Sequence, residues 1–165
     1  MRATHAVAHT MSGRSRGAVL VLVFVMAVLF NYLWELAQSP LYAGLGSFTT
    51  MWWHCFVASL GDGLLTLLIV AAGWMTLRRA SWFLHPGVRG YTLMLTVGLL
   101  IGVSVEWVAV YMAGRWTYSA QMPLVPGLGV GLIPVAQMLL LPPLVFRVVA
   151  LWYGRSSEKK SSMTS

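Results

Sequence analysis

Residues 17–42 read GAVLVLVFVMAVLFNYLWELAQSPLY, and this stretch decides the class of the fold. Its first part is an unbroken apolar run, and a transmembrane helix needs about 20 predominantly apolar residues. Its second part adds polar groups at helical spacing, because Asn31, Glu35 and Gln38 are four and three residues apart and so share one helix face. The stretch therefore predicts a membrane helix that carries a polar stripe near one end.

The whole chain has the composition of a membrane protein. Of its 165 residues, 58% are hydrophobic and 9% are charged, whereas an ordinary soluble domain has about 25% charged residues. Hydropathy and length predict an all-α, polytopic membrane protein, a four-transmembrane-helix bundle with helices at about residues 17–37, 54–77, 91–114 and 130–152. The expected domains are an N-terminal tail at 1–16, one membrane domain at 17–153 and a basic tail at 154–165.

The basic residues predict the orientation. Ten of the eleven lie before the first helix, between the second and third, or at the end of the fourth and beyond; Arg115 is the exception. Positively charged connections stay on the cytoplasmic side. We therefore expect both termini to be cytoplasmic and the protein to lie in the plasma (inner) membrane. Tryptophans then fall at both interfaces, as aromatic belts do: Trp52, Trp53 and Trp116 outside, and Trp74, Trp82 and Trp152 inside.

In this orientation, polar residues of all four helices fall at one depth in the outer half of the bilayer. Asp62 and Glu106 each lie about 12 Å from the outer ends of their helices, Gln137 about 10 Å and Glu35 about one turn. An acidic residue in the bilayer costs about 2.5 to 3.5 kcal/mol on insertion scales. Three acidic residues at one level favour a functional pocket, although polar residues also join membrane helices in purely structural roles.

The charge balance of this cluster predicts a proton donor. Arg115 is the only permanent cation on the outer side. Three carboxyl groups cannot all ionise at low cost beside it, because like charges repel and an apolar environment disfavours the charged form. We therefore expect at least one of Asp62 and Glu106 to be protonated at neutral pH, and such an acid can protonate an apolar substrate.

Neighbouring residues complete the predicted pocket. Gly98 and Gly102 form a GxxxG pair that lets another helix approach, and Glu106 continues the same face and so points into the bundle. The loop at 115–129, RWTYSAQMPLVPGLG, is expected to form an ordered cap. Arg115 either pairs with Glu35 or Glu106 or binds an anionic head group, and both alternatives stay open.

The segment from Glu106 to Pro143 resembles small carotenoid-modifying membrane proteins, the membrane lycopene cyclases and carotenoid hydratases. The similar features are an acid within the membrane, Glu106, then the turn GRWTY at 114–118, then a helix that carries Pro134. The resemblance implies acid–base chemistry on an isoprenoid. The cyclases carry a Pro-x-Glu type motif late in the fold, and the corresponding helix here has Gln137 instead of an acid.

These features predict an acidic pocket that binds a lipid-like or isoprenoid ligand and modifies it, if the protein is an enzyme, by isomerase, cyclase or hydratase chemistry. The predicted catalytic residues are the acid–base pair Glu106 and Asp62, together with Glu35. The predicted ligand-binding residues are Asn31, Gln38, His54, Arg115, Trp116, Tyr118 and Gln137. We expect no cofactor and no metal, because His54 is the one histidine on the outer side and Cys55 is the only cysteine.

Two other functions fit the same residues. The acids could belong to a proton or cation transport pathway, although the inner halves of the helices carry no ionisable residue to continue it. They could also pair this chain with a membrane partner or with further copies of itself. Nucleic-acid binding is excluded, because the basic residues cluster at helix ends and not in a stripe interleaved with aromatics.

Overall fold

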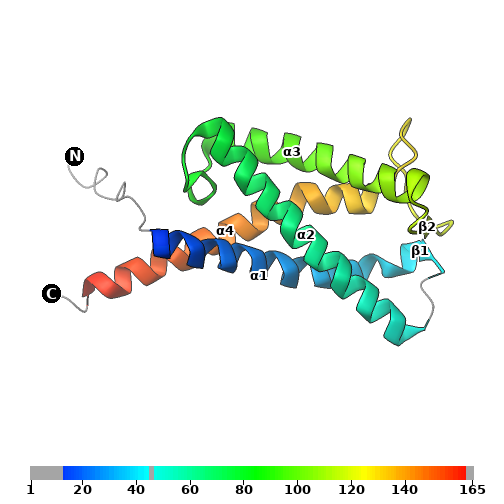
Figure 1. The fold of residues 1–165 in the computed structure, drawn as a ribbon, viewed down its shortest axis with the longest axis horizontal. Coiled ribbons are helices and arrows are strands. Elements are labelled where there is room, and N and C mark those ends of the chain that lie inside the picture. Colours follow the sequence, from blue (N-terminus) through cyan, green and yellow to red (C-terminus); the bar gives the residue numbers. More distant parts are fainter. Residues whose placement is uncertain (1–12, 45–46, 163–165) are drawn as a thin grey trace.

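The computed structural model describes residues 13–44 and 47–162 and confirms the all-α, four-helix class (Figure 1). The helices are α1 (Gly13–Gln38), α2 (Phe48–Leu77), α3 (Gly87–Trp107) and α4 (Leu132–Ser162). A π-helical turn, η3 (Val108–Met112), continues α3. Each of the four is long and apolar enough to cross a membrane, so the chain is a multi-pass membrane protein.

Most helix ends lie outside the predicted bounds, whereas α3 with η3 ends at Met112 and α4 begins at Leu132, each two residues inside them. Hydropathy marks the apolar middle of a helix and not its ends. α2 begins at Phe48 because the side chain of Ser47 caps it and accepts a hydrogen bond from the Thr50 N–H at 3.5 Å. α3 begins at Gly87, directly after Pro86. α1 begins at Gly13 and α4 continues to Ser162, so part of each predicted tail is helical.

Small residues hold the helices together in two close pairs, α1 with α2 and α3 with α4. A Cβ added to Gly63 of α2 would lie 2.8 Å from side-chain atoms of both Phe24 and Val28 of α1. A Cβ added to Gly98 of α3 would collide with the carbonyl oxygen of Met138 in α4. The GxxxG spacing in α3 therefore does mark a close helix contact, as predicted.

One end of the bundle, here called the η2 end, contains the apolar core. The short helix η2 (Trp82–Leu84) folds the connection between α2 and α3 back against the bundle. Trp82 is fully buried, its Nε1 donates to the carbonyl oxygen of Val70 at 2.9 Å, and its ring lies against Gly73. The prediction that Trp82 belongs to an interfacial belt is therefore wrong. Trp52, Trp53, Trp74 and Trp152 of the predicted belts are exposed.

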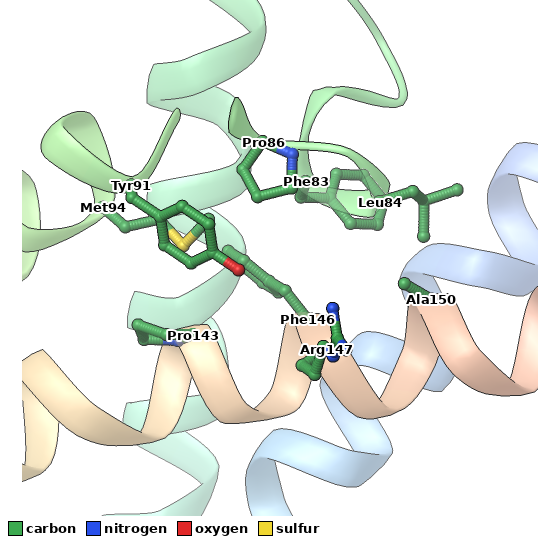
Figure 2. A pocket seen from close by; sticks show the side chains of 9 residues that line it. All are labelled: Phe83, Leu84, Pro86, Tyr91, Met94, Pro143, Phe146, Arg147 and Ala150. Atoms are coloured by element: carbon green, nitrogen blue, oxygen red, sulfur yellow. The ribbon is translucent and has the colours of Figure 1, made fainter. Parts of the chain in front are cut away.

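A small cavity lies beside this core. Figure 2 shows Phe83 and Pro86 on one side of it and Pro143, Phe146 and Arg147 of α4 on the other. Its volume is about 40 Å³, which leaves room for little more than one or two water molecules. The cavity is too small to be the predicted ligand pocket.

The opposite end, here called the cap end, is closed by two short strands. β1 (Tyr42–Ala43) follows α1, β2 (Thr117–Tyr118) follows α3, and the two pair antiparallel with Tyr42 opposite Tyr118. The Ser119 N–H also donates to the Leu41 carbonyl oxygen at 2.9 Å. In Figure 1 the strands lie at the end of the bundle opposite the start of α1. They tie together the connections that follow α1 and α3.

Candidate functional site

Gln137 of α4 connects polar groups of three helices. Its Nε2 lies 2.7 Å from Asn31 Oδ1, 2.9 Å from Asp62 Oδ2 and 3.2 Å from Glu35 Oε1. The amide has two N–H hydrogens, so the two shorter contacts, to Asn31 and Asp62, are its main hydrogen bonds. Its Oε1 accepts from Gln38 Nε2 at 3.1 Å. One buried amide thus joins α1, α2 and α4.

The polar stripe of α1 forms the first wall of this network. Gln38 Nε2 donates to Glu35 Oε1 at 2.8 Å, and Trp34 Nε1 donates to Gln38 Oε1 at 3.2 Å. Asn31 Nδ2 donates to the Ala27 carbonyl oxygen at 2.8 Å, which turns Asn31 Oδ1 toward α4. The helical spacing of the stripe predicts this common face, and the structure adds its partner on α4.

Glu35 and Asp62 meet across α1 and α2. Both carboxyl groups contact the same amide nitrogen, Gln137 Nε2, at 3.2 Å from Glu35 and 2.9 Å from Asp62. Two ionised carboxylates held this close would repel one another, so a single proton on the pair is favoured. The pair is therefore arranged to share a proton.

Glu106 of α3 has a separate, aromatic environment. The Tyr118 hydroxyl donates to Glu106 Oε2 at 2.5 Å and accepts from the Gly131 N–H at 2.8 Å. The buried indole N–H of Trp116 has no hydrogen-bond partner among the described residues, and Trp116 lines the same cavity as Glu106. The Tyr42 ring packs on both Trp116 and Tyr118, with ring centroids 6.0 and 5.9 Å apart. Aromatic side chains from both cap-end connections are thus packed together beside Glu106, and one of them, Tyr118, donates to it.

Local backbone structure sets this arrangement. The π-helical turn η3 begins at Val108, two residues after Glu106, and beyond its end at Met112 the Arg115 N–H donates to the Ala109 carbonyl oxygen at 2.8 Å. Gly114, just before Arg115, has a positive φ of 54°, a conformation that glycine adopts easily. The chain therefore reverses at once, and β2 returns Trp116 and Tyr118 to the carboxyl group that precedes the turn.

A cavity of about 550 Å³ lies between these two groups of residues. All three predicted catalytic residues line it, as do His54, Arg115, Trp116 and Gln137 of the predicted ligand-binding residues. The rest of its wall is mainly apolar and comes from α2, α3 and α4. The cavity thus has carboxyl groups on opposite sides and apolar side chains between them.

Three predicted ligand-binding residues lie behind the wall. Asn31 and Gln38 are buried and hydrogen-bond to Glu35 or Gln137, and Tyr118 hydrogen-bonds to Glu106. None of the three is a wall residue in the described part of the chain. They orient the groups that line the cavity.

Arg115 and His54 occupy more peripheral positions. Both are exposed and both line the cavity. The His54 ring Nδ1 is 2.8 Å from the Thr50 carbonyl oxygen, one turn earlier in α2. Over residues 13–44 and 47–162, Arg115 forms no ion pair with Glu35 or Glu106.

Tyr42 and Ser39 also line the cavity, and neither is predicted from the sequence. Both belong to the stretch SPLY that ends the α1 motif, where Ser39 begins the 3₁₀ turn η1 (Ser39–Leu41). The signal that could have identified Tyr42 is an aromatic residue in each of the two cap-end connections. A two-residue strand is too short to be recognised by alternation, so the pairing with Tyr118 was not predictable.

The tyrosines at this site are held in the neutral form. Burial raises the pKa of Tyr118, and its hydrogen bond to Glu106 raises it further. Burial also raises the pKa of Tyr42, with the negative charge of Glu106 as the next cause. Both hydroxyl groups therefore keep their protons at neutral pH and can donate hydrogen bonds.

The carboxyl groups of the cavity lie in two different settings. No group of three His, Cys, Asp or Glu side chains within the described ranges could hold a metal ion. One carboxyl pair, Glu35 and Asp62, shares contacts to Gln137 on one wall, and on another wall Glu106 accepts a hydrogen bond from Tyr118. Such a division provides an acid and a base on two sides of one space.

Comparisons with protein-family models, with curated proteins and with solved structures found no match for this chain.

Proposed function

We propose that this membrane protein binds a lipid-like or isoprenoid molecule in the cavity between α2 and α3 and carries out acid–base chemistry on it. The main support is the cavity of about 550 Å³, whose wall combines apolar side chains with Glu35, Asp62 and Glu106. Its volume is in the range of small-molecule sites, which are largely apolar and carry a few convergent polar groups. The similarity of the GRWTY turn to carotenoid-modifying proteins agrees with an isoprenoid ligand.

The two carboxyl environments suggest different roles. The Glu35–Asp62 pair is the proton donor, because two carboxyl groups that contact one amide nitrogen favour holding a proton between them, and Gln137 orients Asp62 from α4. Glu106 is the acceptor, because its Oε2 is already placed to accept a hydrogen bond, from the Tyr118 hydroxyl at 2.5 Å. Protonation of a double bond by Asp62 and removal of a proton by Glu106 would together move that double bond. Addition of water to the protonated intermediate would give a hydration instead.

Two alternative functions have less support. A proton pathway would need polar groups toward the η2 end, but the buried side chains there are largely apolar, among them Val23, Ile69 and Phe146. A partner subunit would need unsatisfied polar groups to meet another chain. The buried amides of Asn31, Gln38 and Gln137 instead find their hydrogen-bond partners within this one.

The test uses the full-length protein purified from its own membrane. Native mass spectrometry with lipid extraction should identify a discrete co-purifying lipid or isoprenoid. Glu106→Gln and Asp62→Asn should each reduce its retention or conversion, and Glu158→Gln, which removes the fourth acidic residue far along α4, should not. If both cavity variants keep the wild-type lipid content and conversion, the proposed function is wrong. Co-purification with another polypeptide in place of a lipid would favour the partner subunit.

A further inference from the structure

The α2 side of the cavity consists of two adjoining stripes of residues. Ala58, Asp62 and Leu65 form the inner stripe and are partly buried. Val57, Gly61 and Leu64 form the outer stripe, at intervals of four and three residues, and all three are exposed. Val57 is 47% exposed and Leu64 61%, although both line the cavity. The outer stripe is therefore an edge at which the cavity meets the surface of the bundle.

The opposite edge is formed by α3. Val105 lines the cavity and is 38% exposed, whereas Glu106, the next residue, is buried. α3 is held against α4 by Gly98 and Gly102, and α2 is held against α1 at Gly63. Because α2 and α3 belong to different close pairs, their cap-end halves stand apart, and Figure 1 shows them diverging from the η2 connection.

Gly61 has no side chain and therefore occupies the least space of the residues along this edge. A Cβ added there would meet nothing within 4 Å, so the absence of a side chain leaves open space. The cap end is covered by the β1–β2 pair and by the rings of Tyr42 and Trp116. The open side of the cavity therefore lies between two membrane-spanning helices, where the surrounding medium is the hydrocarbon of the bilayer.

We propose that a chain-like, apolar ligand dissolved in the bilayer enters the cavity sideways between α2 and α3, across Gly61. Gly61 limits the width of chain that can pass, and the end of the ligand that carries the reactive group comes to rest between Asp62 and Glu106. This inference rests on the proposed function and adds the ligand's route and a residue that determines specificity. An apolar edge admits a hydrocarbon chain at low cost and disfavours a charged, water-soluble molecule.

Photolabelling in liposomes tests this route. The probe is hexadecanol with a diazirine near the end of its chain, added to full-length protein in vesicles, with labelled peptides located by mass spectrometry. We expect the cavity wall, residues 54–65 and 102–106, to be labelled above the exposed lipid-facing residues Leu29 and Leu33 of α1. Gly61→Leu should reduce labelling of the cavity wall about tenfold, which corresponds to a loss of about 1.4 kcal/mol in the binding free energy of the probe.

Gly17→Leu is the matched control. Gly17 is also exposed and also has nothing within 4 Å of an added Cβ, but it lies on α1 away from the cavity. Labelling of the cavity wall in the Gly17→Leu variant should equal that in the wild type. Wall labelling that survives Gly61→Leu in a folded protein would overturn the sideways route. If Gly61→Leu does not fold, Val57→Trp, which fills the same exposed edge, decides the question by the same criterion.

The experiment separates this route from the proposed function. A wild-type wall that is labelled no more than Leu29 and Leu33 would mean that the cavity holds no chain, and both proposals would be wrong. A labelled wall with unchanged labelling in Gly61→Leu and Val57→Trp would leave the ligand site intact and remove only the entry across Gly61.

Discussion

The Tyr118 hydroxyl donates to Glu106 Oε2 at 2.5 Å and accepts from the Gly131 N–H at 2.8 Å. A residue of the cap-end connection therefore holds a carboxyl group of α3 and is itself held by the start of the segment that leads into α4. Through these two hydrogen bonds, the connection between α3 and α4 fixes the orientation of the Glu106 carboxyl group. It is also the contact at the site that mutation can remove most cleanly.

Tyr118→Phe removes the hydroxyl group and little else. A hydrogen bond to a charged group contributes about 1.5 to 3 kcal/mol, so we expect ligand retention or conversion to fall about tenfold or more. Thermal stability should change much less. Tyr111→Phe is the matched control, because its hydroxyl also bonds near the cap end but donates to the Gly129 carbonyl oxygen at 2.9 Å. Equal effects of the two variants on the ligand would contradict the role of Tyr118.

Gln137→Leu should destabilise the protein by about 3 kcal/mol, because a buried polar group left without its partner costs about 1 to 3 kcal/mol. Asn31, Asp62 and Gln38 would each lose a hydrogen bond. Thermal unfolding in detergent measures the effect, with Gln121→Leu, an exposed loop residue, as the control. A Gln137→Leu protein as stable as the control would mean that the amide does not hold the helices together.

Gly98→Ala should weaken the contact between α3 and α4. The new Cβ would collide with the Met138 carbonyl oxygen, which is a backbone atom and cannot rotate away. Forcing extra volume into a packed interface costs about 1 to 3 kcal/mol. Gly17→Ala, which meets nothing within 4 Å, should be neutral or slightly stabilising. Unfolding temperatures of the two alanine variants provide the measurement, and equal values would contradict the close contact.

Alkaline titration should reveal the two buried tyrosines. The pKa values of Tyr42 and Tyr118 are raised, and an unfolded tyrosine has a pKa of about 10. Below about pH 10 both states keep the proton, so the stability contributed by the neutral hydroxyl groups is complete; it is lost as pH rises from there toward the raised values. Tyrosinate absorbance should include a component that appears only above the pH at which ordinary tyrosines ionise, and this component should be smaller in Tyr118→Phe. The absence of a late component in the folded wild type would contradict the raised pKa values.

The helices could be predicted because hydropathy and length are local properties of the sequence. The face shared by Asn31, Glu35 and Gln38 could be predicted for the same reason, since it depends only on spacing within one helix. The hydrogen bonds from Gln137 to Asn31 and Asp62 could not, because spacing does not tell which helices are neighbours. Counting along each helix predicts that these residues lie at one depth in the membrane. Which of them come into contact is determined by the helix packing at Gly63 and Gly98.

Trp82 and Tyr42 illustrate what local patterns miss. Trp82 follows a helix end and precedes a polar turn, which is typical of an interfacial tryptophan. The chain instead turns inward at η2, and Gly73 leaves the space that the indole fills. Tyr42 reaches the site through a two-residue strand whose partner is far away in the sequence. Both positions depend on contacts between distant segments.

The π-helical turn η3 has a consequence for the length of the chain at this point. A π-helical turn holds one residue more than an α-helical turn, and successive residues of an α-helix are rotated by about 100°. Deleting one residue between Val108 and Met112 would restore regular winding and swing the following segment by about that angle. Trp116 and Tyr118 would then face away from Glu106, although every side chain named at the site would still be present. The spacing between Glu106 and the GRWTY turn is thus as much a part of the site as the residues themselves.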